Sequence, residues 1–299
     1  MALSKFLDPK NDIAFRKIFG SEKHKDILIH FINDILELKN NSQIEDVEFL
    51  SPIQDPEIAS KKQSIVDVLC RDKNGVQIIV EMQVAPTKGF EKRAQYYAAK
   101  AYSRQLNKGH EEDGRYHNLK EVIFIAIADC IIFEGKKEYK SDHIILDKNS
   151  YAHDLQDFYF TFIELPKFTK TKIEELSSVI EKWCFFFKYA DKTNEADLEK
   201  LIGSDLVIQT AYDALNQFNW SEQELLSYEQ EVKRVRDNIA ALEYQIDQAE
   251  ARGEARGEAK GIAKEKIEIA KAMLLDGDSI EKVAKITGLT INDIQKLIS

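Results

Sequence analysis

The sequence has few cysteines, no long apolar run and no excess of positive charge. Its three cysteines, Cys70, Cys130 and Cys184, are too few and too far apart for a disulfide framework, which predicts a reducing compartment. No CxxC or HxH pair occurs, so we expect no structural zinc site. The longest apolar run, residues 122–133, contains Asp129 and is too short to cross a bilayer. We therefore expect a cytoplasmic protein without membrane contact.

The charge balance limits which partners the chain can bind. Its 52 acidic residues outnumber the 42 basic ones, which gives a net charge of −10. A protein of this charge has no general electrostatic affinity for nucleic acid, so any such binding requires a local basic patch. A length of 299 residues allows a full-sized core and one to three domains.

The first 168 residues predict an α/β domain. Apolar residues recur at helical spacing over residues 9–38, with a break near Gly20 and Ser21. Short runs rich in β-branched and aromatic residues, bounded by turn residues, predict strands. The expected elements after the first helices are strands near 44–50, 61–71 and 76–84, a helix at 88–108, and strands at 120–128, 142–147 and 157–164. The order begins αβββαβ, which indicates a mixed sheet with helices on its faces.

The rest of the chain predicts helices. We expect a helical region at 169–220, with helices near 171–190, 194–202 and 204–218. Apolar residues then alternate spacings of three and four, which is typical of a coiled coil over 221–275. These residues are Leu225, Tyr228, Val232, Val235, Ile239, Leu242, Ile246 and Ala249. The pattern predicts a homodimer through the C-terminal helices; the alternative is a long helix packed on its own domain.

A repeat rich in Gly, Glu and Ala follows at residues 251–264. Its three glycines, Gly253, Gly257 and Gly261, each cost a helix about 1 kcal/mol. The heptad frame would place Gly253, Arg256 and Lys260 in the seam, so the coiled coil is expected to fail here. We interpret the segment as a strained or flexible helical connector. Because its basic residues are balanced by Glu, the sequence favours no nucleic-acid role for it.

The tail at 276–299 resembles a helix-turn-helix unit. A turn at Gly288 and Leu289 follows Val283, and Thr290 is placed to cap the next helix. The tail has three Lys against four Asp and Glu, and its second helix has only Lys296. A helix that enters the major groove is expected to be more positive. The charge therefore favours a helical cap or docking module over a DNA reader.

The residues that carry chemistry lie in the predicted hairpin. Asp67 and Glu81 are carboxylates within apolar strands, and Gln83 shares a strand face with Glu81. A three-residue loop at 73–75 would pair Asp67 with Glu81 and put Gly75 in the left-handed conformation. A two-residue Asn-Gly loop would turn Asp67 to the other face. The sequence permits both registers.

In the first register the hairpin predicts a metal site. Asp67 and Glu81 would ligate Mg²⁺ or Mn²⁺, and the backbone carbonyl of Met82 would be a third oxygen ligand. Such a metal activates a water and polarises a phosphodiester. Gln83 would hydrogen-bond that water. The alternative is a pair of solvated carboxylates on an exposed sheet, but apolar neighbours on both faces indicate a covered sheet, where carboxylates need a partner.

The predicted helix at 88–108 is basic. Several of its cations recur at a spacing of four residues directly after the Glu81 strand, and tyrosines are interleaved with them. The candidate DNA-binding residues are Lys88, Lys92, Arg93, Tyr97, Lys100 and Arg104. In an acidic protein this helix is the best candidate for contact with a phosphate backbone, the alternative being an ordinary solvated helix face.

These residues carry a resemblance to a known family. The motifs concerned are Asp12-Ile-Ala-Phe-Arg-Lys-Ile-Phe19, Asp67, Val80-Glu-Met-Gln83, Arg93-Ala-Gln-Tyr-Tyr97, Tyr116 ahead of Val122-Ile-Phe-Ile125, and the Gly-Glu-Ala repeats with Gly288-Leu-Thr290. Together they resemble the Rpn family of recombination-promoting nucleases, also labelled PD-(D/E)XK nuclease family transposases. The resemblance covers nearly the whole chain. It implies a restriction-endonuclease-like αβββαβ core with a mostly helical C-terminal half.

The resemblance also implies an activity and a set of site residues. It implies a Mg²⁺-dependent endonuclease (Mn²⁺ or Ca²⁺ being alternatives) that cuts double-stranded DNA in recombination or in defence against mobile elements and phages. Asp67 and Glu81 would be metal ligands and catalytic residues, with Gln83 in place of the motif lysine. Asp12 matches a position that can add a carboxylate, although a first-turn acid also favours a helix N-terminus. Because Gln departs from Lys, the alternative is a catalytically weak nuclease-like protein that binds DNA or oligomerises.

Overall fold

The computed structural model describes residues 5–54, 64–106, 116–203 and 206–297, and it divides into two compact units, Met1–Val232 and Lys233–Ser299. The predicted positions 61–63, 107–108, 204–205 and 298–299 lie outside the described residues. In the first unit, the helices are α1 (Asp12–Phe19), α2 (Lys25–Ile35), α3 (Phe90–Ser103), α4 (Val179–Tyr189), α5 (Glu195–Ile202) and α6 (Leu206–Leu215). The main strands are β1 (Val47–Phe49), β4 (Val68–Asp72), β5 (Gln77–Gln83), β6 (Val122–Ala128), β7 (Lys140–Ile144) and β8 (Phe158–Glu164).

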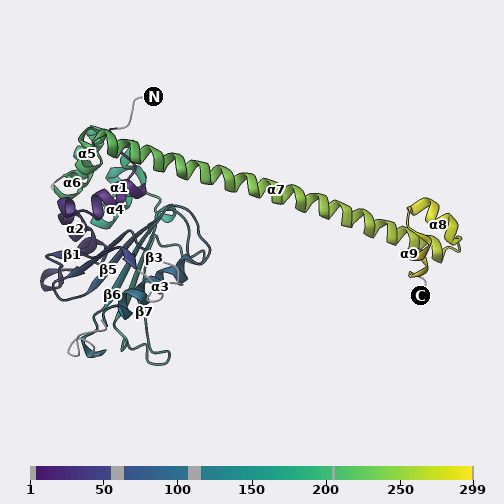
Figure 1. The fold of residues 1–299 in the computed structure, drawn as a ribbon, viewed down its shortest axis with the longest axis horizontal. Coiled ribbons are helices and arrows are strands. Elements are labelled where there is room, and N and C mark those ends of the chain that lie inside the picture. Colours follow the sequence, from purple (N-terminus) through teal and green to yellow (C-terminus); the bar gives the residue numbers. More distant parts are fainter. Residues whose placement is uncertain (1–4, 55–63, 107–115, 204–205, 298–299) are drawn as a thin grey trace. The chain divides into compact units, whose positions relative to one another are not determined.

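A six-stranded mixed sheet organises the first unit (Figure 1). Its order is β1-β4-β5-β6-β8-β7, and β5, β6 and β8 run parallel while the other neighbours are antiparallel. The parallel strands β5 and β6 are buried along almost their whole length, because helices cover both of their faces. The predicted α/β class with a mixed sheet is confirmed.

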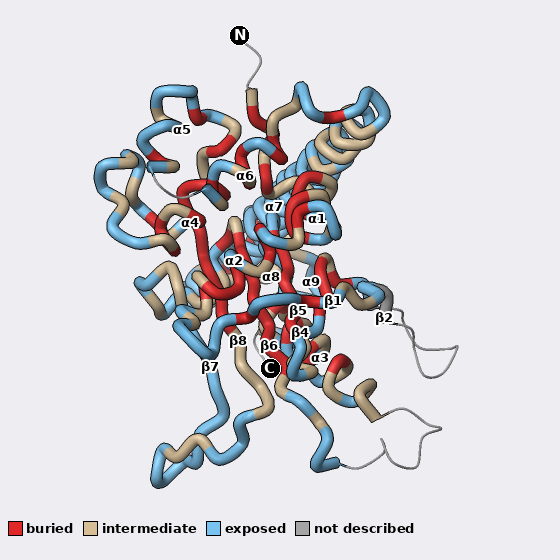
Figure 2. Tube along the Cα trace, turned by 90° about the vertical axis from the view of Figure 1, so that its left-hand side faces the viewer, coloured by how far each residue is buried: buried red, intermediate tan, exposed pale blue. Residues whose placement is uncertain are grey.

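The two faces of the sheet pack against different helices. Alternate residues of β5, Ile78, Val80 and Met82, belong to a core shared with α1, α2, α4 and α6. The residues between them face α3, where Ile79 packs with small side chains of that helix. Figure 2 shows burial concentrated in these central strands and in the helices nearest to them. Glu81 and Gln83 share the α3 face with Ile79, because side chains along a strand alternate between its two faces.

The predicted strand at 61–71 is interrupted. A short strand β3 (Ser64–Ile65) pairs with β2 (Ile53–Gln54), and β4 begins only at Val68. Between them the amide of Val66 donates to the carbonyl of Pro52 at 3.1 Å, which draws the chain away from β5. Asp67 therefore lies at the start of β4 with no ladder partner of its own, and its side chain is available for other contacts.

In the second unit, one helix and a small core replace the layered fold. Helix α7 (Glu222–Leu275) crosses the boundary of the two units and continues without a break through the glycines of the repeat, because Ala, Arg, Glu and Lys are strong helix formers. The short helices α8 (Ile280–Thr287) and α9 (Ile291–Gln295) follow. Ala270, Val283 and Ile294 form their buried core. None of the helices in the described ranges has a stretch long and apolar enough for a bilayer.

Candidate active site

The hairpin of β4 and β5 takes the register that brings the two carboxylates together. Val68 lies opposite Val80, and the amide of Asp72 donates to the carbonyl of Val76 at 3.0 Å. The loop therefore has three residues, 73–75, and Gly75 has a φ of 91°. Continuing this register places Asp67 opposite Glu81. Of the two hairpins that the sequence permits, the structure has the one required for a metal site.

Asp67 is held by two hydrogen bonds. Its Oδ2 accepts from the backbone N–H of Met82 at 3.0 Å, and its Oδ1 accepts from the guanidinium of Arg16 at 3.0 Å. The first bond replaces the backbone ladder bond that is lost where the strand is interrupted. The second reaches across from α1. Each carboxylate oxygen has a second lone pair, so both remain able to ligate a cation.

Glu81 is buried beside Asp67 and is incompletely paired. Only 6% of the residue is exposed, and its Oε1 has no hydrogen-bond partner in the described part of the chain. Burial, and next the neighbouring Asp67, raise the pKa of Glu81 well above its ordinary value; Arg93 and Arg16 oppose this. A buried carboxylate with an orphaned oxygen beside a second carboxylate is an arrangement that a cation would stabilise.

The backbone of Met82 faces the same position. The amide of Gln77 donates to the carbonyl of Glu121, and the carbonyl of Gln83 accepts from the amide of Asp129, so both bond to the residues that flank β6. Because hydrogen bonding alternates along a strand, the amide and carbonyl of Met82 point to the opposite side, toward the chain that carries Asp67. The Met82 N–H confirms this direction by its bond to Asp67. The Met82 carbonyl is thus on the side where a third oxygen ligand is needed.

These groups fit a divalent cation that keeps several waters. Mg²⁺ is commonly bound by one or two carboxylates with water completing its shell, and the site offers Asp67, Glu81 and one carbonyl. Within the described residues no set of three or more His, Cys, Asp and Glu side chains is grouped for a metal. Asp12 therefore does not join the pair in such a group, although its helix supplies Arg16 one turn later.

The side-chain amide of Gln83 is not free to bind a water at the site. Its Nε2 donates to the carbonyl of Ala85 and to Oγ1 of Thr87, the latter at 3.0 Å. Its Oε1 accepts from the guanidinium of Arg93. Both ends of the amide are thus held by protein groups. The predicted role of Gln83 in orienting a water has no support in these contacts, which instead connect Gln83 to a cation on α3.

Arg93 brings a positive charge to the carboxylate pair. Its guanidinium carbon lies 4.8 Å from the ring centroid of Phe90 and 6.0 Å from that of Tyr97. Its Nε is buried without a partner among the described residues. Burial, followed by the charge of Glu81, raises the pKa of Tyr97. The sequence predicted Arg93 as a DNA-binding cation, and the packing of α3 on β5 places it beside the carboxylate pair. Arg16 was not among the predicted site residues, although it belongs to a motif that carried the resemblance.

The other predicted DNA-binding residues spread along α3. Lys88 and Lys92 are exposed near its N-terminus, next to the loop that follows Gln83. Lys100 lies a further two turns along, 5.9 Å from the ring centroid of Tyr96. Arg104 lines a pocket of about 360 Å³ with Arg71, Lys120 and Gln77. Gln77 begins the strand whose other end holds Glu81 and Gln83, so the predicted cations do not converge on one point.

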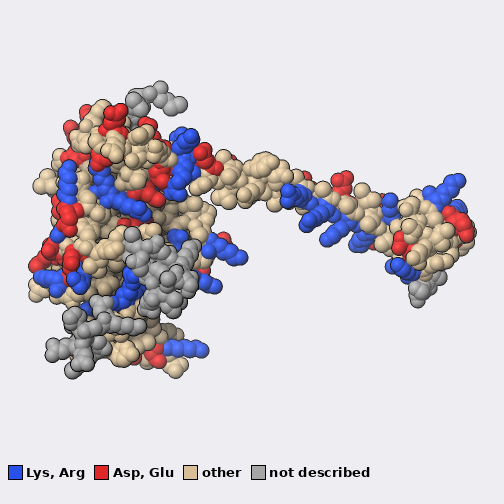
Figure 3. All heavy atoms as spheres, viewed as in Figure 1, with Lys and Arg blue, Asp and Glu red and all other residues tan. Residues whose placement is uncertain are grey.

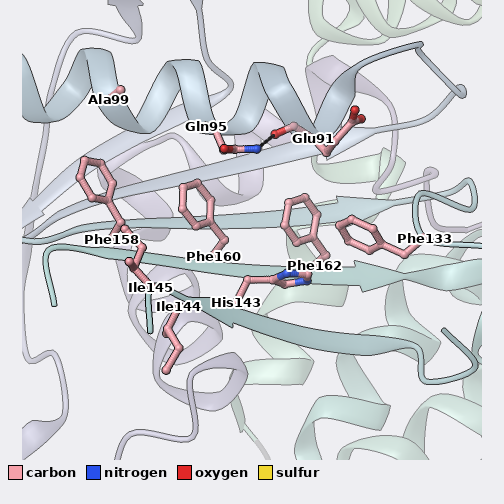
Figure 4. Close-up of a pocket in the computed structure, with 10 residues that line it drawn as sticks. All are labelled: Glu91, Gln95, Ala99, Phe133, His143, Ile144, Ile145, Phe158, Phe160 and Phe162. Atoms are coloured by element: carbon pink, nitrogen blue, oxygen red, sulfur yellow. Dashed lines mark hydrogen bonds between the residues drawn. The ribbon is translucent and has the colours of Figure 1, made fainter. Parts of the chain in front are cut away.

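A larger pocket, of about 500 Å³, lies elsewhere (Figure 4). Glu91, Gln95 and Ala99 line it from one side of α3, and phenylalanines of β8 line it from the sheet. Arg93 and Tyr97 lie two positions on from Glu91 and Gln95, about 200° around the helix. The pocket therefore belongs to a different face of α3 from the carboxylate pair. Its single acidic residue, Glu91, offers no paired carboxylates for hydrolysis.

Comparison with protein families gives two matches. A family model described as PD-(D/E)XK nuclease family transposase matches residues 9–245. A second, described as Rpn/YhgA-like nuclease family, C-terminal HTH domain, matches residues 263–299. No curated protein and no solved structure matches the chain. The first model covers the sheet, α3 and the carboxylate pair, and the second confirms the helix-turn-helix that the tail predicted.

Proposed function

The chain belongs to the PD-(D/E)XK nuclease family transposases, and from this premise we propose that it is a metal-dependent endonuclease that hydrolyses phosphodiester bonds of double-stranded DNA. The observation that carries the proposal is the orphaned Oε1 of Glu81, buried beside Asp67. A carboxylate in that position costs stability unless it serves a bound cation. Recombination, or defence against mobile elements and phages, is the biological setting that we propose for this activity.

Asp67, Glu81 and the Met82 carbonyl would hold Mg²⁺, with Mn²⁺ or Ca²⁺ as alternatives. When bound, such an ion lowers the pKa of a coordinated water and stabilises the charge that develops on a phosphate. The protein orients its ligands in advance: Arg16 and the Met82 amide fix the two oxygens of Asp67. Ligands held in place before the substrate arrives need no reorganisation during the reaction.

Arg93 would supply the positive charge that the motif lysine provides elsewhere in this superfamily. Its guanidinium is held by Gln83 and acts electrostatically on Glu81. In this interpretation Arg93 stabilises the additional negative charge on the phosphate as water attacks and the bond to the leaving oxygen breaks. Gln83 is then a positioning residue that fixes the guanidinium. Under this proposal, the replacement of the motif lysine by Gln83 would not deprive the site of a cation.

Cleavage of supercoiled plasmid tests the proposed function. The full-length protein should cut in Mg²⁺ or Mn²⁺, and Asp67→Ala and Glu81→Ala should each lower the rate by about 10³-fold or more, because each removes a metal ligand. Glu45→Ala is the matched control, since Glu45 is an exposed carboxylate paired with Lys73 far from the site. Cleavage that survives both site substitutions would remove the proposed centre. Retention of DNA without cleavage in any metal would favour a catalytically weak DNA-binding protein.

A homodimer through α7 is the second part of the proposal. Of the predicted heptad positions, Ile239, Leu242 and Ile246 are 46%, 57% and 56% exposed. Apolar residues repeated on one face of an exposed helix are the pattern of a coiled-coil seam. The helix-turn-helix match adds DNA as a partner of the tail. Two copies would then present two catalytic units and two tails to one duplex.

A further inference from the structure

The Gly-Glu-Ala repeat of α7 separates its charges onto different sides of the helix. Because α7 is helical throughout, residues four apart lie about 6 Å apart along its axis and about 40° apart around it. Arg252, Arg256, Lys260 and Lys264 therefore form one continuous row, which we call the basic stripe. All four are exposed. Figure 3 shows Lys and Arg side chains gathered along one side of this part of α7.

The acids of the repeat and of the residues next to it do not share this side. Each residue turns an α-helix by about 100°. At this geometry every one of these acids lies at least about 100° around the helix from the centre of the basic stripe. They are Glu250, Glu254, Glu258, Glu265 and Glu268. The basic and acidic residues that balance in the composition therefore lie on different sides of the helix. One side of the helix presents cations to a partner.

The spacing also prevents pairing within the helix. Arg252, Arg256 and Lys260 have no acid three or four positions away, and each has a like charge four positions away. Like charges at this spacing destabilise a helix, whereas a solvated helix commonly gains from Glu and Lys placed four apart. Of the four residues of the basic stripe, only Lys264 has an ion pair among the described residues, a 3.9 Å contact with Glu268. The arrangement costs stability unless an external anion neutralises it.

The glycines beside the basic stripe indicate that another molecule can approach the backbone of the helix closely. Gly253 and Gly257 each lie next to a cation of the stripe, and a Cβ added to either would meet no atom of the described chain within 4 Å. Their cost to the helix is therefore not offset by packing inside the molecule. A bare backbone allows another molecule's backbone to come near. Both features are expected of a surface that receives a phosphodiester strand.

A second copy of α7 fits this stretch poorly. Arg256 and Lys260 lie on the side of the helix that carries Leu242 and Ile246, so a parallel dimer continued through the repeat would set like charges against each other. The stretch also leads directly into the helix-turn-helix match at 263–299. We infer that the basic stripe of α7 binds the phosphate backbone of double-stranded DNA, independently of sequence, next to the DNA contact proposed for the tail.

Fluorescence anisotropy with a labelled 30-base-pair duplex of arbitrary sequence, in EDTA and over a series of NaCl concentrations, tests this inference on the full-length protein. Each phosphate contact contributes about 0.9 to the slope of log K against log salt. Replacing all four cations by Gln should therefore lower the slope by about 3–4 and weaken binding at low salt. An unchanged slope overturns the inference.

A variant in which one Arg and one Glu exchange positions keeps the net charge unchanged and so separates the effect of the stripe from that of net charge. Arg256→Glu with Glu258→Arg keeps the charge and creates ion pairs four residues apart, so the helix should become more stable by circular dichroism. The inference requires that the slope of log K against log salt nevertheless fall by at least about 1 in this variant. Unaltered DNA binding with a changed mass in light scattering would mean that the stripe serves a second copy. Because EDTA prevents metal-dependent cleavage, failure of the nuclease proposal leaves this test intact.

Discussion

The carboxylate pair and the basic stripe place charge in opposite environments. Glu81 is buried, and desolvation raises its pKa, so the role proposed for it depends on what burial does to a charge. Arg252, Arg256 and Lys260 are exposed, and the role inferred for them depends on charges that the helix leaves unpaired. In both places the arrangement is unfavourable for the protein alone. The comparison shows that a ligand is best sought where the chain by itself leaves charge uncompensated.

The charge of Arg93, which lies beside the carboxylate pair, gives the largest expected effect among the tests of this comparison. Arg93→Ala should lower kcat for plasmid cleavage by about 10²–10³-fold, as is typical when one preorganised donor to a developing charge is removed. Adding Gln83→Lys to that variant should recover much of the loss, because lysine restores a cation at the motif position. Gln83→Ala together with Arg93→Ala should lose no more than either alone, since the two act as a unit.

Lys137→Ala, which removes an exposed cation from the loop after β6, is the control for Arg93 and should retain full activity. A second measurement does not depend on turnover. Without the Arg93 charge, Mn²⁺ should bind more tightly in calorimetry, because the cation no longer repels it. Weaker Mn²⁺ binding would mean that Arg93 only maintains the shape of the site, and the electrostatic role would have to be abandoned.

The burial of Glu81 predicts how stability changes with pH. Its folded-state pKa is raised above the ordinary value of 4.5, so its contribution is fully present below that value and is lost as pH rises through the folded-state pKa. In EDTA at pH 8, Glu81→Gln should therefore be more stable than the wild type by about 1–3 kcal/mol, the scale of a buried unsatisfied group. Chemical denaturation at pH 4 and pH 8 measures this.

Glu45→Gln is the control for that measurement, because Lys73 lowers the pKa of Glu45 at the surface. It should show no gain in stability at pH 8. Added Mg²⁺ should stabilise the wild type and leave Glu81→Gln unchanged. A Glu81→Gln variant that is less stable than the wild type at pH 8 in EDTA would show that the carboxylate is satisfied without a metal.

The exposed helix α7 gives the smallest expected change, a factor of two in the mass of the protein in solution. Leu242→Asp with Ile246→Asp places charges in the proposed seam and should convert a dimer to a monomer in light scattering. Tyr244→Asp is the matched control, because Tyr244 is 65% exposed and lies off the seam. Equal masses for the wild type and the seam variant would show that the heptad pattern does not mediate assembly.

Local patterns in the sequence predicted most elements of the fold. The break at Gly20, the buried strand β6 and the turn at Gly288 all lie where periodicity and capping residues placed them. The boundaries were less accurate where side chains compete with the backbone. The helix expected from 171 begins at Val179, after the Ser178 side chain caps it by accepting from the amide of Glu181. The strand expected at 61–71 is interrupted at Val66 and Asp67, where the Val66 amide bonds to Pro52 and the side chain of Asp67 accepts the Met82 N–H.

The sequence by itself determined the residue types: two carboxylates in apolar strands, a basic helix after them, and four cations at a spacing of four. It left the hairpin register open, because a loop of two or three residues is compatible with the same turn sequence. Only the tertiary structure decided that Asp67 faces Glu81, that Arg93 reaches Gln83 and that Arg104 lies at the far end of the sheet. These relations join residues on different elements, and they depend on how the elements pack.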